Sequence, residues 1–171
     1  MSVSSKITSE LDKLFAGRRP TRWVTRERPK IDRIACPWLI LRFIDPKAEF
    51  LYVAATEVFD TAAREKAAAY DIPGAPFEHH GERCSFDAFV DRFALTAPGL
   101  DYLAKTVRGA DTSRLDLTPE SPGLYAMSLG LSRMYADDHE MLRHGLTMYD
   151  AFYAWILQAR DEKHAWPPKI E

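Results

Sequence analysis

The first half of the chain alternates strand-like and helical segments, and this alternation is the strongest constraint on the fold. Residues 21–25 and 49–53 are short runs with β-branched and aromatic side chains, which are typical of strands. Residues 31–44 between them are apolar nearly all round, as in a buried helix. The order continues with a helix, a shorter strand and a further helix capped by Ser85, over residues 56–70, 76–80 and 86–93. The pattern predicts a small parallel sheet with right-handed crossovers.

The second half changes character, because no strand pattern follows Pro98. We expect a helix over 99–108 and one or two long helices over 122–160. The predicted fold class is therefore α+β and α-rich, with a small parallel β-α-β-α-β half followed by an α-helical half in a single domain. Three regions are expected, namely a flexible N-terminal arm with a short, poorly packed helix from residue 9 to 15, the domain, and a tail that Pro167 and Pro168 keep out of helix, over residues 1–20, 21–160 and 161–171.

Composition excludes several classes of protein. A chain with 46% hydrophobic and 28% charged residues has the composition of a packed, water-soluble globule. Its longest nearly uncharged apolar stretch, residues 34–41, is far shorter than the roughly 20 residues that span a bilayer. The polar N-terminus shows no signal-peptide pattern, so we expect a cytoplasmic protein without a membrane partner. Cys36 and Cys84 are expected to be free thiols.

Basic residues are concentrated early in the chain. Residues 18–33 hold seven Lys and Arg against two acidic residues, so this stretch carries +5 and the remainder about −7. It either attracts an anion or only solubilises the surface. The side chains expected to bind a small oxyanion here and near residue 83 are Arg26, Arg28, Arg33 and Arg83. Nucleic acid is not expected, since no RNA-binding aromatic signature accompanies the charge.

A column of large side chains recurs every seven residues in the long helical stretch, and it predicts a core face. Its members are Met127, Met134, Met141, Met148 and Trp155. Asp138 interrupts the neighbouring column, and two interpretations stay open. In a continuous helix Asp138 points into the core and needs a pairing partner or a metal. Alternatively the helix breaks near Ala136, with Asp137 as N-cap and Glu140 completing an acidic capping box.

Residues 78–85 (EHHGERCS) form the segment richest in chemistry, at a predicted strand end just before a helix. Imidazole, carboxylate and thiolate groups together suit Zn²⁺ or another borderline ion, and Gly81 lets the backbone turn. Only one of His79 and His80 can face the core from a strand, so only one is expected to be a ligand. The alternative is a histidine pair in a turn with no metal role.

The candidate site residues fall into two sets, and no catalytic residue is assigned. A divalent transition metal, zinc, iron or manganese, is expected on ligands drawn from His79, His80, Glu82, Asp138 and His139. Ligand binding is expected from Arg26, Arg28, Asp32, Arg33, Cys84, Arg108 and Asp111.

Structural roles compete for several of these residues. Asp32 is either an acid in the first turn of a helix or a carboxylate beside His79. Cys84, which Arg83 and a helix dipole would activate, is either a catalytic thiol, a metal ligand or an inert buried cysteine. Arg108 and Asp111 either belong to a helix-ending turn or enter the same cleft.

At these motifs the sequence resembles the C-terminal domain of the bacterial chromate resistance protein ChrB. The similarity runs from about residue 22 to 159. It is carried by residues 23–40 (WVTRERPKIDRIACPWLI), 43–46 (FIDP), 80–87 (HGERCSFD), 107–112 (VRGADT), 131–133 (LSR), 136–139 (ADDH) and 149–155 (YDAFYAW). The resemblance implies a role in chromate resistance and its stress response, as a chromate-responsive regulator or an accessory protein. It implies no settled activity.

Longer members of that family carry another domain ahead of this one, so we expect this chain to be the sensing or chemical half. The main hypothesis is a metal-binding enzyme or accessory domain with an arginine-rich oxyanion cleft. The alternative is a non-catalytic sensor of chromate, sulfate or phosphate. A third hypothesis, an interaction module that uses the Met and aromatic face, predicts an exposed apolar patch. A homodimer is left open.

Overall fold

The computed structural model describes residues 5–162, and the expectation for Pro167 and Pro168 lies outside this part. Three parallel strands form a sheet in the order β2-β1-β3. The strands are β1 (Arg22–Arg26), β2 (Glu49–Val53) and β3 (Ala68–Ala69). In the first half, the helices are α2 (Ile31–Leu39), a π-helical extension (Ile40–Ile44), a 3-10 turn (Ala55–Glu57), α3 (Val58–Glu65) and α4 (Ser85–Phe93).

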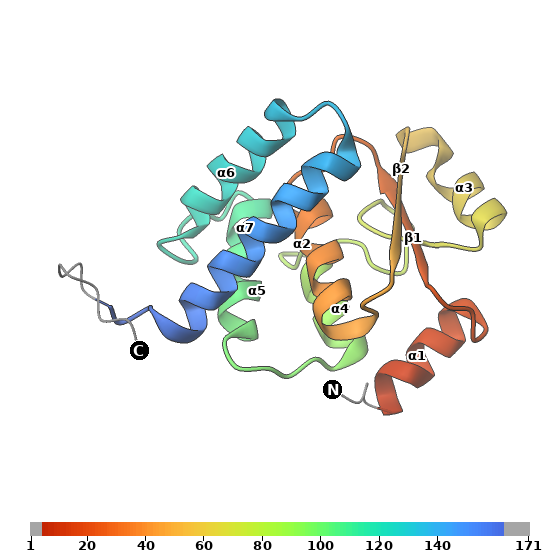
Figure 1. Ribbon diagram of the computed structural model, residues 1–171, viewed down its shortest axis with the longest axis horizontal. Coiled ribbons are helices and arrows are strands. Elements are labelled where there is room, and N and C mark those ends of the chain that lie inside the picture. The colour runs from red at the N-terminus through yellow and green to blue at the C-terminus, as the bar shows by residue number, and fades with distance from the viewer. Residues whose placement is uncertain (1–4, 163–171) are drawn as a thin grey trace.

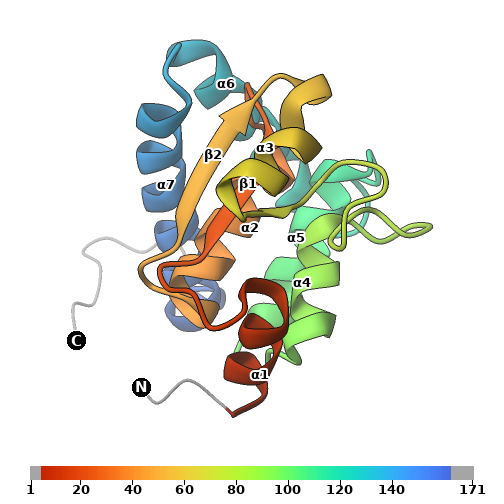
Figure 2. The ribbon, with the colours of Figure 1, turned by 90° about the vertical axis from the view of Figure 1, so that its right-hand side faces the viewer.

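Helices cover both faces of the sheet, which is why the central strand β1 is apolar on both sides. Trp23 packs on the side of α2 and α4, while Val24 packs with Val58 of α3 on the other side. Figure 1 shows the sheet edge-on between these layers, and Figure 2 shows α3 in front of the strands with α2 behind them. The carboxyl ends of β1 and β3 consequently lie side by side at one edge of the sheet.

The second half adds three helices on the α2 side. They are α5 (Leu100–Asp111), α6 (Ser121–Met134) and α7 (Asp138–Gln158). The last of them, α7, packs along α2, where Gly145 lets Ile34 approach the helix backbone. The predicted fold class, a small parallel β-α-β-α-β half followed by an α-helical half, is thus confirmed.

Two boundaries near the third strand differ from the prediction. The helix expected over 56–70 ends at Glu65, because Lys66 adopts a left-handed conformation, and β3 follows at once. The strand expected over 76–80 reduces to two isolated bridges, between Phe77 and Tyr70 and between His80 and Arg83. The N-cap of α4 is Cys84 rather than Ser85. A two-residue strand is too short to show alternation, so sequence periodicity could not locate it.

The N-terminal segment is packed rather than arm-like. Helix α1 (Ser5–Phe15) buries Ile7, Leu11 and Phe15 in the main core, against α4. The prediction of a poorly packed helix over 9–15 is therefore wrong. The helix begins at Ser5, and its three buried apolar residues share one face at helical spacing.

The long helical stretch breaks where the second interpretation placed it. Asp137 caps α7, its Oδ1 accepting from the Glu140 amide at 2.7 Å. The break shifts the helical phase, so Met127 is 57% and Met134 70% exposed, whereas Met141 is buried. The core expected at the first two methionines is wrong, and α6 instead buries the residues Ser121, Leu124, Ser128 and Ser132.

No helix in residues 5–162 combines the length and the apolar character that crossing a membrane requires.

Candidate functional site

Charged side chains gather where the carboxyl ends of β1 and β3 meet the first turns of α2 and α4. Arg26 ends β1, Asp32 lies in the first turn of α2, and Asp71 follows the end of β3. His79 comes from the loop before α4, and Asp111 is the last residue of α5. Ligand sites of parallel sheets lie at this edge.

Three carboxylates converge on one nitrogen of His79. Its Nε2 lies 3.0 Å from Asp111 Oδ2, 3.2 Å from Asp71 Oδ1 and 3.5 Å from Asp32 Oδ2. A ring nitrogen carries at most one hydrogen, so it satisfies only one of these acceptors. Asp32, His79 and Asp111 each offer an atom of metal-ligand type, all within 4.8 Å of one another. They are the one such group in residues 5–162.

Asp32 is the buried member of the group, with a side chain only 1% exposed. Its Oδ2 accepts from the Ser85 amide at 2.5 Å and the Phe86 amide at 3.3 Å, at the positive end of α4. Burial nevertheless raises the pKa of Asp32 to about 7, and the charge of Asp111 adds to the effect. The ionised form of Asp32 is therefore disfavoured in the absence of a further cation.

The pKa of His79 is raised as well, and for an imidazole this favours the charged form. Its hydrogen bond with Asp111, followed by those with Asp32 and Asp71, raises the pKa of His79 to about 12. The imidazole therefore holds a proton in the metal-free protein and supplies one positive charge to three carboxylates.

Asp71 belongs to this group but is not among the site residues that the sequence predicts. Asp71 adopts a left-handed conformation with φ +53° and accepts at Oδ1 from the Ser85 hydroxyl at 3.0 Å. Arg26 Nη2 lies 3.0 Å and Arg33 Nε 3.2 Å from Asp71 Oδ2. Burial acts to raise the pKa of Asp71, but the His79 hydrogen bond and the two arginines lower it overall. Its position directly behind a buried strand was the available signal, which was lost because β3 was assigned to a helix.

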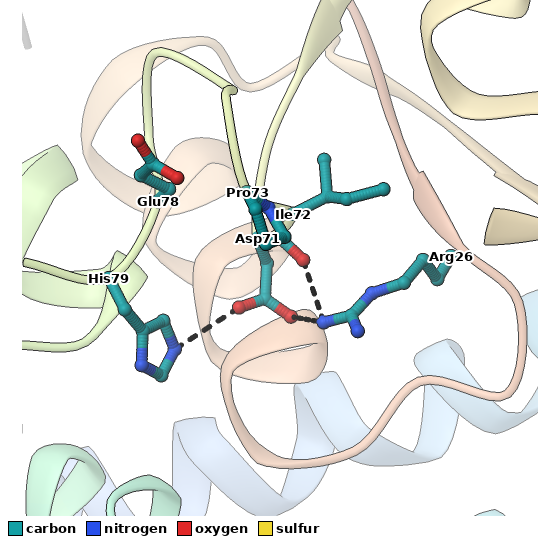
Figure 3. A pocket seen from close by; sticks show the side chains of 6 residues that line it. All are labelled: Arg26, Asp71, Ile72, Pro73, Glu78 and His79. Carbon is teal, nitrogen blue, oxygen red and sulfur yellow. Dashed lines mark hydrogen bonds and ion pairs between the residues drawn. The ribbon is translucent and has the colours of Figure 1, made fainter. Parts of the chain in front are cut away.

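A cavity of about 270 Å³ opens beside this group. It is lined by Arg26, Asp71, Ile72, Pro73, Glu78 and His79. Figure 3 shows Arg26 and His79 approaching the Asp71 carboxylate from opposite sides. The side chain of His79 is 40% exposed, whereas that of Asp32 is buried, so the group is reached from the cavity side.

The expected arginine cluster separates in the structure. Arg33 Nη1 donates to the backbone oxygens of Arg26 and Glu27, and its guanidinium is mostly buried against Asp71. Arg28 donates to three backbone carbonyls at the end of α6. Among these basic side chains, Arg26 lines the cavity.

Arg83 and Arg108 bind carboxylates of α4. Arg108 holds Asp87 through two hydrogen bonds of 2.6 and 2.7 Å, and Arg83 lies 2.9 Å from Asp91. Asp87 also accepts from the Cys84 amide at 3.1 Å. These interactions stabilise the start of α4 and leave neither arginine directed into the cavity.

His80 and Glu82 do not join the group. The backbone amides of His80 and Arg83 each donate a hydrogen bond to the carbonyl of the other residue, and His80 is exposed. The Glu82 side chain is 88% exposed and lies 3.7 Å from Arg114. Of the two adjacent histidines, the structure places His79 in this group and leaves His80 outside it.

Asp138 and His139 have other neighbours. Asp138 Oδ2 accepts from the Arg28 amide at 2.9 Å, and the ring of His139 packs edge-on against Tyr52. Neither belongs to the group around His79. From the expected metal ligands, the structure thus selects His79, and it joins to it Asp32 and Asp111 from the expected ligand-binding set.

Cys84 and Cys36 are both fully buried free thiols. Burial raises the pKa of each thiol well above its usual value. Cys84 lies at the start of α4, yet its Sγ faces Asp87 Oδ2 at 3.6 Å. The geometry fits an inert buried cysteine better than a nucleophile, which requires an accessible thiolate.

Comparison with known proteins agrees with the resemblance in the sequence. The family model described as "ChrB, C-terminal domain" matches residues 23–156. Protein ChrB of Cupriavidus metallidurans is 32% identical over 147 residues, covering 85% of this chain. The aligned region makes up 43% of that relative, so the chain spans less than half of its length. No solved structure matches the chain. The chain belongs to the ChrB C-terminal domain family.

Proposed function

We propose that this chain is a divalent-metal-binding domain that acts in chromate resistance, with Asp32, His79 and Asp111 as the ligands. Membership of the ChrB family supports the link to chromate resistance. The convergence of three carboxylates on the Nε2 atom of His79 supports the metal.

The donor set favours particular ions. Imidazole nitrogen and carboxylate oxygen together suit zinc, iron or manganese, whereas a thiolate, which would favour softer ions, is absent from this group. A divalent cation in place of the His79 proton would face all three carboxylates, including Asp71. It would also offset the cost of burying Asp32 in its ionised form.

Three protein ligands leave coordination positions open, as catalytic metal sites do. The cavity on the His79 side gives a small molecule access to them. A metal bound here would act as a Lewis acid or lower the pKa of a bound water. The arrangement thus suits a metal-dependent enzyme or an accessory domain that binds its ligand through the metal.

Arg26 favours a second candidate, a non-catalytic sensor of a small oxyanion. Its side chain is 37% exposed and lines the cavity, and its buried Nε has no hydrogen-bond partner in residues 5–162. A guanidinium next to protonated His79 would bind chromate, sulfate or phosphate without any metal.

Elemental analysis and titration of the full chain with Zn²⁺, Mn²⁺ and Fe²⁺ distinguish the two candidates. The metal site predicts about one ion per chain in the wild type. Loss of the ion is expected in His79→Ala and Asp111→Asn, and retention in the matched controls His80→Ala and His139→Ala. Absence of metal binding in the wild type, together with sulfate binding that Arg26→Gln abolishes, would replace the metal site with the sensor.

A further inference from the structure

We propose that Arg28 is a positioning residue for the metal centre, because it fixes the turn from which Arg26 and Asp32 reach the site. The inference rests on the proposed function. It gives a role to Asp138 as well, which acts on the centre through Arg28 rather than as a ligand.

The turn between β1 and α2 is short and carries site residues at both ends. Arg26 is the last residue of β1, and Asp32 is the second residue of α2. Arg28 lies between them with φ +55°, a left-handed conformation that residues other than glycine rarely adopt. Such a conformation persists only where surrounding contacts hold it.

The side chain of Arg28 supplies those contacts at the end of α6. Nη1 donates to the carbonyls of Tyr135 and Ala136, each at 2.9 Å, and Nη2 donates to the carbonyl of Ser132. The last carbonyls of a helix lack partners within the helix and form the negative end of its dipole. A guanidinium from a distant turn therefore serves as the cap of α6.

The backbone of the turn is tied to the same corner. The Arg28 amide donates to Asp138 Oδ2 at 2.9 Å, and Arg28 Nη1 lies 3.7 Å from Asp138 Oδ1. That second oxygen is buried and accepts no hydrogen bond from residues 5–162. Asp138 thus depends on Arg28 for its nearest positive charge, and the two residues should act as one unit.

Displacement of this turn would reach the metal ligands directly. The amide of Asp32 donates to Asp111 Oδ1 at 3.3 Å, so the start of α2 links two ligands of the proposed centre. Residues outside the coordination sphere that orient ligands typically change metal affinity 10-fold to 100-fold when mutated. The Arg28 side chain is 45% exposed, so its loss should affect folding much less than ligand geometry.

The test is a Co²⁺ titration of the full chain, followed by visible absorption of the bound ion. Arg28→Gln should weaken Co²⁺ binding at least about 10-fold and change the absorption spectrum. Arg28→Lys should bind Co²⁺ with an affinity between those of the wild type and Arg28→Gln, because an ammonium group keeps the charge but cannot donate to three carbonyls as a planar guanidinium does. Asp138→Ala should act in the same direction, and the double variant should lose less than the sum of the two.

Arg133→Gln is the matched control, because Arg133 is an exposed residue of α6 that forms no ion pair with residues 5–162. It should leave affinity and spectrum unchanged. Circular dichroism of the metal-free variants measures the folded fraction. Equal affinity and spectrum in Arg28→Gln and wild type would overturn the positioning role while leaving the metal site intact. A loss of affinity fully accounted for by unfolding would also overturn it. A wild type that binds no Co²⁺ would remove the proposed function and this inference together.

Discussion

Two buried aspartates at the start of α4 meet opposite electrostatic surroundings. Asp32 and Asp87 each expose 1% of their side chain, and both accept backbone amides of the first turn or its cap. Asp87 has a cation of its own, since Arg108 binds both of its oxygens. Asp32 shares the charge of His79 with Asp71 and Asp111, of which Asp71 also pairs with Arg26 and Arg33.

This difference in pairing distinguishes a carboxylate that stabilises the fold from one that is suited to bind a cation. A buried carboxylate that is paired with its own guanidinium completes a local network and needs nothing further. Asp32 and Asp111 share one imidazole, while the two arginines pair with Asp71, so a bound cation would relieve the repulsion between Asp32 and Asp111. The raised pKa of Asp32, due first to burial and then to Asp111, reflects that repulsion.

The largest effect is expected from breaking the paired carboxylate. Arg108→Gln leaves Asp87 buried with only Arg83, 3.6 Å away, as a cation partner and should lower the free energy of unfolding by about 3–5 kcal/mol. Urea denaturation measures it. The control Arg114→Gln removes an exposed ion pair with Asp116 and should leave the unfolding midpoint unchanged. If Arg108→Gln lowered the free energy of unfolding by less than about 1 kcal/mol, the distinction between a paired Asp87 and an unpaired Asp32 would be wrong.

The second variant removes charge from the unpaired carboxylate. Asp32→Asn keeps an oxygen for the amides of Ser85 and Phe86 but relieves repulsion from Asp71 and Asp111. The metal-free protein should therefore keep its free energy of unfolding within about 1 kcal/mol of wild type. Affinity for Zn²⁺, measured by calorimetry, should fall by at least about 100-fold, because a ligand is lost. Destabilisation as large as that of Arg108→Gln would instead make Asp32 a structural residue like Asp87.

The same edge of the sheet shows what the sequence could predict. The segment β1-α2-β2 was evident because its apolar residues alternate and cluster over lengths that suit each element, and the bounds of β2 agree with the prediction. Parallel sheets bind ligands at the carboxyl ends of their strands, and the structure places Arg26 and His79 at that edge. Asp32 and Asp111 were identified as binding side chains by residue type and context, although they were not assigned to the same set as His79.

What the sequence could not provide were contacts between distant segments. The three proposed ligands lie at positions 32, 79 and 111, and only packing of α5 against α4 and α2 brings Asp111 to the others. Asp138 matched the chemistry of a ligand equally well, but the break at Asp137 turns it toward Arg28. Most buried residues of α6 are serines, so the buried face of this helix does not show the apolar periodicity that predicts the other helices.

The smallest effect is expected at Cys84, the N-cap residue of α4. Burial raises the pKa of both thiols, so less thiolate is present at any pH than for an ordinary cysteine. Native protein at pH 8 should therefore not react with a thiol reagent over a period in which urea-unfolded protein releases two equivalents, one each from Cys36 and Cys84. Cys84→Ser should likewise leave the metal stoichiometry unchanged, because its Sγ faces Asp87 rather than the ligand group. Rapid release of one equivalent from native protein would show that one of the thiols is reactive. Loss of the metal in Cys84→Ser would show that the Cys84 thiol takes part in the metal site.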